Sequence, residues 1–170
     1  MILNKVFFVI LISMKLTLFN IGKTDVDYLR KGIEDYTGRI GYFINFSVVD
    51  LPTVKHSRKS PAVELIKKES DIISGAVSES SCIVLLDEKG VQLSSAGFAK
   101  WLEHKMNQGI KSIAFVTGGA YGFSEKIYKM ADERISLSKM TFTHQMVRLI
   151  FVEQLYRALT IIKSIPYHNG

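Results

Sequence analysis

The stretch that decides the fold is Ser112-Ile113-Ala114-Phe115-Val116-Thr117-Gly118-Gly119-Ala120-Tyr121-Gly122. Residues 112–116 form a continuous apolar run without the polar alternation of a half-exposed strand, which indicates a strand buried on both faces. The glycines that follow allow positive φ angles and predict a tight turn into the next element. A buried strand that runs directly into such a turn is typical of a parallel sheet covered by helices.

Strands and helices alternate through the rest of the chain. Strands are expected at 15–21, 43–49, 83–86, 112–116 and 133–137, and helices at 25–42, 61–77, 94–108, from 124 onward, and 143–164. Ser94 or Ser95 and Thr143 are the expected helix caps, and Gly109 ends the third helix. This order predicts an α/β fold with a mostly parallel sheet and helices on both faces.

Composition limits the function classes. With 170 residues, 47% of them hydrophobic, the chain is long enough for one domain with a well-buried core. Its net charge of +6 favours a polyanionic partner such as nucleic acid, although solubility alone would account for it. Cys82 lies in an apolar run and is interpreted as a small buried hydrophobe, with a reactive thiol as the alternative.

Several kinds of catalytic site are not indicated. The chain has no G-x-x-x-x-G-K-[ST] phosphate loop, no G-x-G-x-x-G and no G-x-S-x-G nucleophile motif. The four histidines, at 56, 104, 144 and 168, lack metal-ligand spacing, so no metal is expected. Any chemistry must then be carried by a bound cofactor.

Residues 1–13 need a separate interpretation. The seven apolar residues 6–12 follow Lys5, as in a secretion signal, but they are too few to span a bilayer, which takes about 20. No small-residue cleavage site follows them. We expect an N-terminal extension outside the fold, with Met14 opening a single domain at 14–170; a signal or anchor is the alternative, and no membrane association is expected.

Two loops could form a small-molecule pocket, because each follows a predicted strand. The turn at 117–122 allows close backbone approach by a flat ligand, and an ordinary strand-to-helix turn is the alternative. The connection at 137–142 interleaves apolar and hydroxyl residues and is long enough to wrap around a ligand such as an adenine. Its alternative is a surface loop that covers the core.

The final helix is apolar nearly all round, which a single sheet cannot cover. We therefore expect a homodimer that forms through this helix, and a pairing of Glu153 with Arg157 four residues on. Basic and aromatic residues suggest RNA contacts, with a solvated loop as the alternative for the first three: Lys55, Arg58, Lys59, Lys139, His144, Arg148, Tyr167 and His168.

From Met14 to its end the chain resembles the bacterial 23S ribosomal RNA (pseudouridine-N3)-methyltransferase family, within the SPOUT superfamily of knotted methyltransferases. The resemblance rests on five segments in the family's order: 85–87, 117–122, 137–144, 152–158 and Pro166-Tyr167-His168. It implies a C-terminal trefoil knot, dimerisation, and S-adenosylmethionine-dependent methylation of a pseudouridine in helix 69 of 23S RNA on assembled cytoplasmic ribosomes. It also implies a set of cofactor-binding residues: Leu86, Gly118, Leu137, Ser138, Lys139, Met140, Thr141 and Phe142.

Two positions depart from the family pattern. Thr143 stands where proline is common, which should loosen the entry to the last helix, and Asn169-Gly170 replaces a basic ending that would contact RNA. The implied reaction is attack of pseudouridine N3 on the sulfonium methyl group, and His144, His168 or solvent could accept the N3 proton. A SPOUT enzyme for another RNA, such as tRNA, and a non-catalytic ribosome-binding module are the alternative functions.

Overall fold

The structure is a computed structural model that describes residues 14–54 and 61–167. Its five strands are β1 (Lys15–Ile21), β2 (Asn45–Leu51), β3 (Cys82–Gln92), β4 (Ser112–Thr117) and β5 (Glu133–Ser136). Its helices are α2 (Asp27–Gly41), α3 (Ala62–Val77), α4 (Ser95–Asn107), α5 (Glu125–Met130) and α6 (Met146–Ile162). The strands form one sheet in the order β2-β1-β4-β3-β5, and every pairing is parallel. The predicted α/β class is confirmed.

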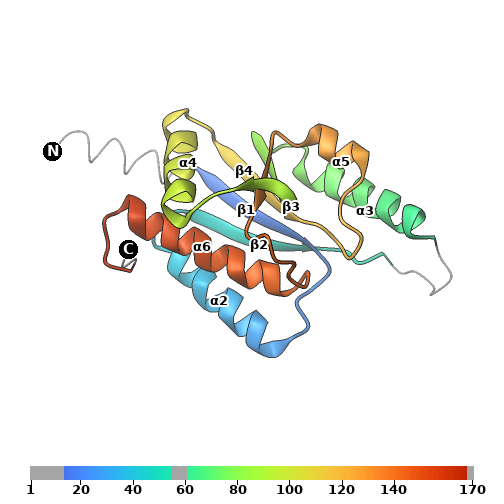
Figure 1. The fold of residues 1–170 in the computed structure, drawn as a ribbon, viewed down its shortest axis with the longest axis horizontal. Coiled ribbons are helices and arrows are strands. Elements are labelled where there is room, and N and C mark those ends of the chain that lie inside the picture. Colours follow the sequence, from blue (N-terminus) through green and yellow to red (C-terminus); the bar gives the residue numbers. More distant parts are fainter. Residues whose placement is uncertain (1–13, 55–60, 168–170) are drawn as a thin grey trace.

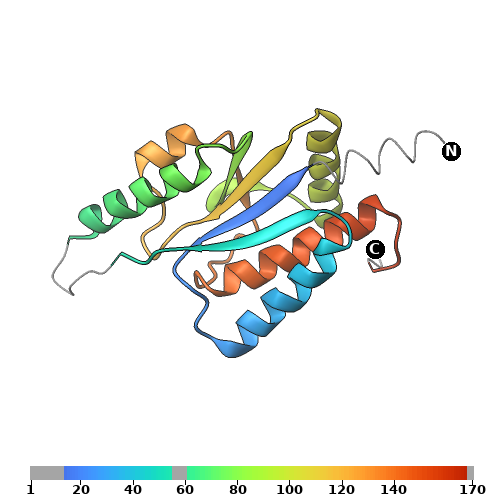
Figure 2. The same ribbon diagram turned by 180° about the vertical axis from the view of Figure 1, so that it is seen from behind.

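Helices cover both faces of this sheet (Figures 1 and 2). Helices α2, α4 and α6 pack on one face, and α3 and α5 on the other. Successive residues of β4 face opposite sides of the sheet: Phe115 lies in the core under α4 and α6, whereas Val116 packs with α3 and α5. This two-sided burial is why β4 is a continuous apolar run.

Local capping confirms several predicted boundaries. The Ser94 hydroxyl accepts a hydrogen bond from Gly97 N at 3.1 Å and caps α4, and Ser124 caps α5 by accepting from Ile127 N. Gly109 has φ +73° just past the end of α4, where a left-handed residue ends a helix.

Among the boundaries that differ from the predictions, those of β2, β3 and α6 each have a physical reason. The amides of residues 43 and 44 still bond to Ile40 O, so β2 begins two residues later than expected. Strand β3 continues past Leu86 to Gln92, because a shift in its register with β5 lets pairing resume at Val91. Helix α6 begins at Met146, but the Thr143 hydroxyl accepts from Met146 N at 3.2 Å, as expected of a capping residue.

The final helix is covered more completely within the chain than its sequence suggested. Besides the sheet, α2 and α4 flank it on two sides, and Phe151 and Leu155 are fully buried. The predicted pair of Glu153 and Arg157 is confirmed at 2.6 Å. The trefoil knot and the homodimer stay predictions, and the predicted extension at 1–13 lies outside the described residues.

Candidate functional site

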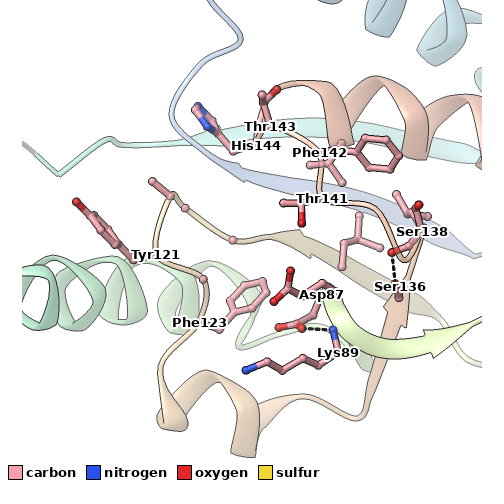
Figure 3. A pocket seen from close by; sticks show the side chains of 18 of the residues that line it. Asp87, Lys89, Tyr121, Phe123, Ser136, Ser138, Thr141, Phe142, Thr143 and His144 are labelled. Atoms are coloured by element: carbon pink, nitrogen blue, oxygen red, sulfur yellow. Dashed lines mark hydrogen bonds between the residues drawn. The ribbon is translucent and has the colours of Figure 1, made fainter.

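A cavity of about 730 Å³ opens at the carboxyl ends of β4 and β5, beside the middle of β3 (Figure 3). Three chain segments that are far apart in sequence line it, at 86–89, 118–123 and 136–144, together with Tyr128 and Val147. In the close-up, Tyr121 and Phe123 project from the segment after β4, and Phe142 lies across from them on the segment after β5. The carboxyl edge of a parallel sheet is where ligands of α/β proteins bind.

The turn after β4 exposes backbone to this cavity. Gly122 has φ +74°, and its amide donates to Gly119 O at 3.1 Å, which closes the turn. A Cβ on Gly119 would overlap the carboxylate of Glu69, which is buried on α3. A residue larger than glycine at 119 would therefore have to displace the Glu69 carboxylate.

A carboxylate forms the polar wall of the cavity. The Tyr128 hydroxyl donates to Asp87 Oδ2 at 2.5 Å, and Lys89 N donates to Asp87 Oδ1 at 2.7 Å. Burial of the phenol, and to a lesser extent its hydrogen bond to Asp87, raises the pKa of Tyr128 to about 12. Tyr128 is thus a fixed donor at neutral pH, and it orients a carboxylate that can accept further hydrogen bonds from a ligand.

The segment after β5 is shaped by two serine contacts. The Ser136 hydroxyl donates to Ser138 O at 2.9 Å, and the Ser138 hydroxyl accepts from Met140 N at 2.8 Å. This serine turn leaves the Met140 side chain 75% exposed at the edge of the cavity. Of the implied cofactor residues, seven line the one cavity, namely Leu86, Gly118, Leu137, Ser138, Met140, Thr141 and Phe142, whereas Lys139 is exposed and does not line it.

His144 lies on the wall of this cavity and also borders a second, smaller one of about 430 Å³ at the ends of β1 and β2. Figure 3 shows it at the far end of the first cavity from Lys89. The next residue, Gln145, accepts hydrogen bonds through Oε1 from Asp25 N and Val26 N, at the start of α2. The entry to α6 is therefore fastened to the chain that follows β1.

Arg148 is not the surface residue that the sequence suggested. Its side chain is 1% exposed, and its guanidinium donates to Ile21 O at 2.7 Å, Gly22 O at 2.9 Å and Thr24 Oγ1 at 3.0 Å. Burial lowers its pKa, and the nearby carboxylates of residues 50 and 25 oppose that shift. This position corrects the predicted phosphate contact, because a guanidinium that is buried and held by the loop after β1 is not exposed to contact RNA.

Tyr167 lies at the other end of α6 from His144. Its hydroxyl is 3.1 Å from that of Tyr36, its ring packs edge-on against Tyr156, and Arg157 stacks over it at 4.9 Å. Within this chain Tyr167 is thus separated from the cavity by the length of the helix (Figure 1). The predicted RNA contacts Lys55, Arg58, Lys59 and His168 lie outside the described residues.

Sequence reasoning missed the polar wall. Asp87 belongs to one of the segments that carry the family resemblance, but it received no role, and nothing in the spacing connects it with Tyr128, 41 positions later. The signal that could have found it is its position, since a carboxylate directly after a buried strand lies at the ligand-binding edge. Within residues 14–54 and 61–167, no group of three His, Cys, Asp or Glu side chains could hold a metal ion.

Solved structures share this fold. A "probable methylase family protein" from Haemophilus influenzae superposes with a TM-score of 0.53 at 12% identity, covering 94% of this chain and 72% of that one. A "probable methyltransferase" from Bordetella pertussis also gives 0.53, at 11% identity, covering 91% of this chain and 99% of that one. At such low identity these likenesses show the fold alone, and they place the chain in the class of α/β proteins with a methylase-type fold.

The sequence match is more specific. The model of the family described as "Predicted SPOUT methyltransferase" matches residues 14–168, and the chain belongs to that family. Curated relatives named "Ribosomal RNA large subunit methyltransferase H" are 46% identical in Flavobacterium johnsoniae and 47% identical in Christiangramia forsetii. Each match spans 156 residues, which is 92% of this chain and 99% of the relative. No helix in the described part of the chain is long and apolar enough to cross a membrane.

Proposed function

We propose that this protein methylates N3 of a pseudouridine in helix 69 of 23S ribosomal RNA, using S-adenosylmethionine, on assembled ribosomes in the cytoplasm. The observation that carries the proposal is the 46% identity over 156 residues with a ribosomal RNA large subunit methyltransferase H that is matched over 99% of its length. The cavity at the ends of β4 and β5 supports it, since seven of the eight implied cofactor residues line that one space.

The residues around the first cavity fit S-adenosylmethionine. A volume of about 730 Å³ lies in the range of cofactor pockets, and the walls combine apolar side chains such as Leu86 and Phe142 with exposed backbone at Gly118. Asp87, already oriented by Tyr128, can accept hydrogen bonds from ligand hydroxyl or amino groups. When bound, the cofactor supplies a methyl group on a sulfonium, which is a good leaving group, so the protein mainly has to position the acceptor.

The acceptor nitrogen must lose a proton as it is methylated. The location of His144 on the walls of both cavities supports it as the proton acceptor, because a group there borders the space that an incoming base would share with the methyl donor. His168 and solvent are the alternative acceptors. A His144→Gln variant with an unchanged pH–rate profile would exclude His144, and the same measurement on His168→Gln would then distinguish His168 from solvent.

Methylation is tested with ribosomes that lack the modification. We expect label from S-adenosylmethionine in large-subunit RNA, at a nucleotide that mass spectrometry maps to helix 69. Gly119→Ala should lower the activity, because Gly119 lines the cavity and the added Cβ must displace the Glu69 carboxylate, whereas Gly75→Ala, with open space around it, serves as the matched control. Label in tRNA instead would support a different RNA substrate, and cofactor binding without any methylation would contradict the proposed enzymatic activity.

The basic segment Lys55-His56-Ser57-Arg58-Lys59 is proposed to contact RNA phosphates, together with His144, Tyr167 and His168. Replacing Lys55, Arg58 and Lys59 by alanine should weaken ribosome binding and lower the salt slope by about one for each phosphate that is no longer neutralised. A Lys100→Ala/Lys111→Ala variant removes exposed cations elsewhere and should leave the slope unchanged. Equal slopes for both variants would remove the assignment.

A homodimer through α6 is also proposed. Ile150 is partly exposed on this helix and lies outside the core cluster, so it is the apolar position best suited to contact a second copy. Light scattering should give the mass of a dimer for the wild type and of a monomer for Ile150→Glu. Val63→Glu changes an apolar residue that is 76% exposed on α3 and should remain dimeric. A monomeric wild type would contradict this proposal.

A further inference from the structure

The second cavity, at the ends of β1 and β2, has no role in the comparisons or in the sequence-based predictions. Its walls carry Lys23, Asp25, Asp50 and Thr53, with His144 at the border to the first cavity. It therefore offers cationic, anionic and hydroxyl groups to a ligand. Its volume, about 430 Å³, is sufficient for a nucleoside.

The two cavities are neighbours on the carboxyl edge of the sheet. Since His144 lines both, a molecule in one comes close to a molecule in the other. A methyl acceptor must approach a donor held in the first cavity, and the second cavity is the adjacent space from which it can do so.

A chain of hydrogen bonds that runs from the buried Thr117 through the buried Asn20 to the exposed Asp50 connects the two. The Thr117 hydroxyl donates to Asn20 Oδ1 at 2.9 Å, and Asn20 Nδ2 donates to Asp50 Oδ1 at 3.2 Å. Asn20 is aligned with Asp50 on β2 and with Thr117 on β4, so the three residues lie in a row across adjacent strands. Both Asn20 and Thr117 are 1% exposed, and Thr117 directly precedes Gly118 of the first cavity.

This chain fixes both the position and the chemistry of Asp50. An ionised carboxylate only accepts, so Asn20 must present its NH₂ to Asp50 and its carbonyl oxygen to the threonine. Oδ1 of Asp50 is thereby occupied, while Oδ2 accepts no hydrogen bond from the described residues. Asp50 thus offers the second cavity an oriented acceptor that is not otherwise used there.

We propose that the second cavity binds the target base, and that Asp50 Oδ2 accepts a hydrogen bond from N1–H of pseudouridine. The inference rests on the proposed function and adds the basis of its selectivity. Pseudouridine is linked to ribose through C5, so N1 carries a hydrogen, whereas N1 of uridine is bonded to ribose and has none. Lys23 and Thr53 can donate to the two carbonyl oxygens of the ring.

Such a site rejects uridine for a physical reason. Asp50 is exposed when the cavity is empty. A base bound there would cover its free oxygen, and a base without the partner N–H would leave that oxygen unpaired, which lowers the rate on that substrate. A single charge-assisted hydrogen bond corresponds to a discrimination of about 10- to 100-fold. We therefore expect Asp50 to favour pseudouridine over uridine by about that factor.

The test uses Asp50→Asn and two ribosome preparations, with either pseudouridine or uridine at the target position and no methyl group. In this variant Asn20 still donates to the side-chain oxygen of residue 50, and the amide NH₂ replaces the free acceptor. We expect kcat/KM on pseudouridine to fall at least about tenfold and kcat/KM on uridine to change less than about threefold. Calorimetric binding of S-adenosylmethionine and the melting temperature should stay at wild-type values, which separates this result from misfolding.

The control is Asp35→Asn, which removes the same charge from an exposed position on α2 where it pairs with Arg39. It should leave both rates unchanged. An equal fall on both substrates in Asp50→Asn, or an unchanged ratio, would overturn the inference while leaving the proposed function intact. A wild-type enzyme that does not methylate pseudouridine-containing ribosomes would overturn the proposed function, and the inference with it.

Discussion

Gly90 should be the glycine least tolerant of substitution, because β3 passes directly over β5 there. The pairing of these strands shifts between Leu86 and Val91, both of which align with Ile135. An ideal Cβ on Gly90 would lie 2.6 Å from the backbone N and C atoms of Ile135 and 2.7 Å from the carbonyl carbon of Arg134. Carbon atoms in contact prefer about 3.5–4.0 Å, so Gly90→Ala requires one strand to move by about 1 Å.

The backbone of β5 has little freedom to move away. Ile135 is 4% exposed and belongs to the core under α4 and α6, so the displacement must disturb that packing or open the bulge. Overpacking of this kind costs about 2–3 kcal/mol. For a chain of this length that corresponds to a fall in Tm of about 4–12 °C. Because Leu137 follows β5 directly, we also expect weaker binding of S-adenosylmethionine.

Thermal unfolding followed by circular dichroism and binding followed by calorimetry measure both effects. Gly75→Ala is the matched control, since a Cβ there has nothing within 4 Å in the interior of α3. Alanine is the better helix former by about 1 kcal/mol, so this variant should melt slightly above the wild type. If Gly90→Ala melts at the wild-type temperature and binds the cofactor normally, the close approach of β3 to β5 is not a constraint and the argument fails.

Three further outcomes are expected. Arg148→Met should lower the free energy of unfolding by about 3 kcal/mol or more in urea titrations, because the loop after β1 loses three charged hydrogen bonds. A loss below about 1 kcal/mol would contradict the proposal that Arg148 stabilises this loop. The pKa of Tyr128 is raised to about 12 in the folded state, so on raising the pH the unfolded state loses this proton first, and the free energy of unfolding should fall between about pH 10 and 12. That of Tyr128→Phe should fall less over this range. If the free energies of unfolding of the variant and the wild type decrease in parallel with pH, the effect is excluded. Burial raises the pKa of the Cys82 thiol, so Ellman's reagent should react with Cys82 only in the unfolded protein. Rapid reaction in the native protein would show that the thiol is accessible.

Local patterns were sufficient for most of the fold. Strand β1 has the predicted bounds, and the predicted serine cap of α4 makes the hydrogen bond expected of it. These features depend on neighbours within a few residues, which a sequence displays directly. The extension of β3 beyond Leu86 depends instead on β5, about 45 positions away, and no local sequence pattern around Gly90 predicts it.

Arg148 shows a different limit of sequence reasoning. A charged residue beside a predicted binding loop is usually exposed, and the prediction of a phosphate contact followed from that. The loop after β1 turns its carbonyl oxygens toward the start of α6, and Arg148 satisfies them from inside the protein. Such a role depends on where the oxygens of another segment point, so it becomes visible only when both segments are placed.

The order of the strands explains why the proposed cofactor site and the proposed base site lie side by side. The sheet runs β2-β1-β4-β3-β5, so the ends of β2 and β1 border the second cavity, and the ends of β4 and β5 with residues 86–89 of β3 border the first. The hydrogen-bonded row of exposed Asp50 and buried Asn20 and Thr117 crosses that boundary, and His144 lines both cavities at the entry to α6. Because the row couples the proposed base-recognition carboxylate to the residue before Gly118, a change at Asn20 should disturb both cavities at once, whereas a change at Asp50 should disturb only the second one.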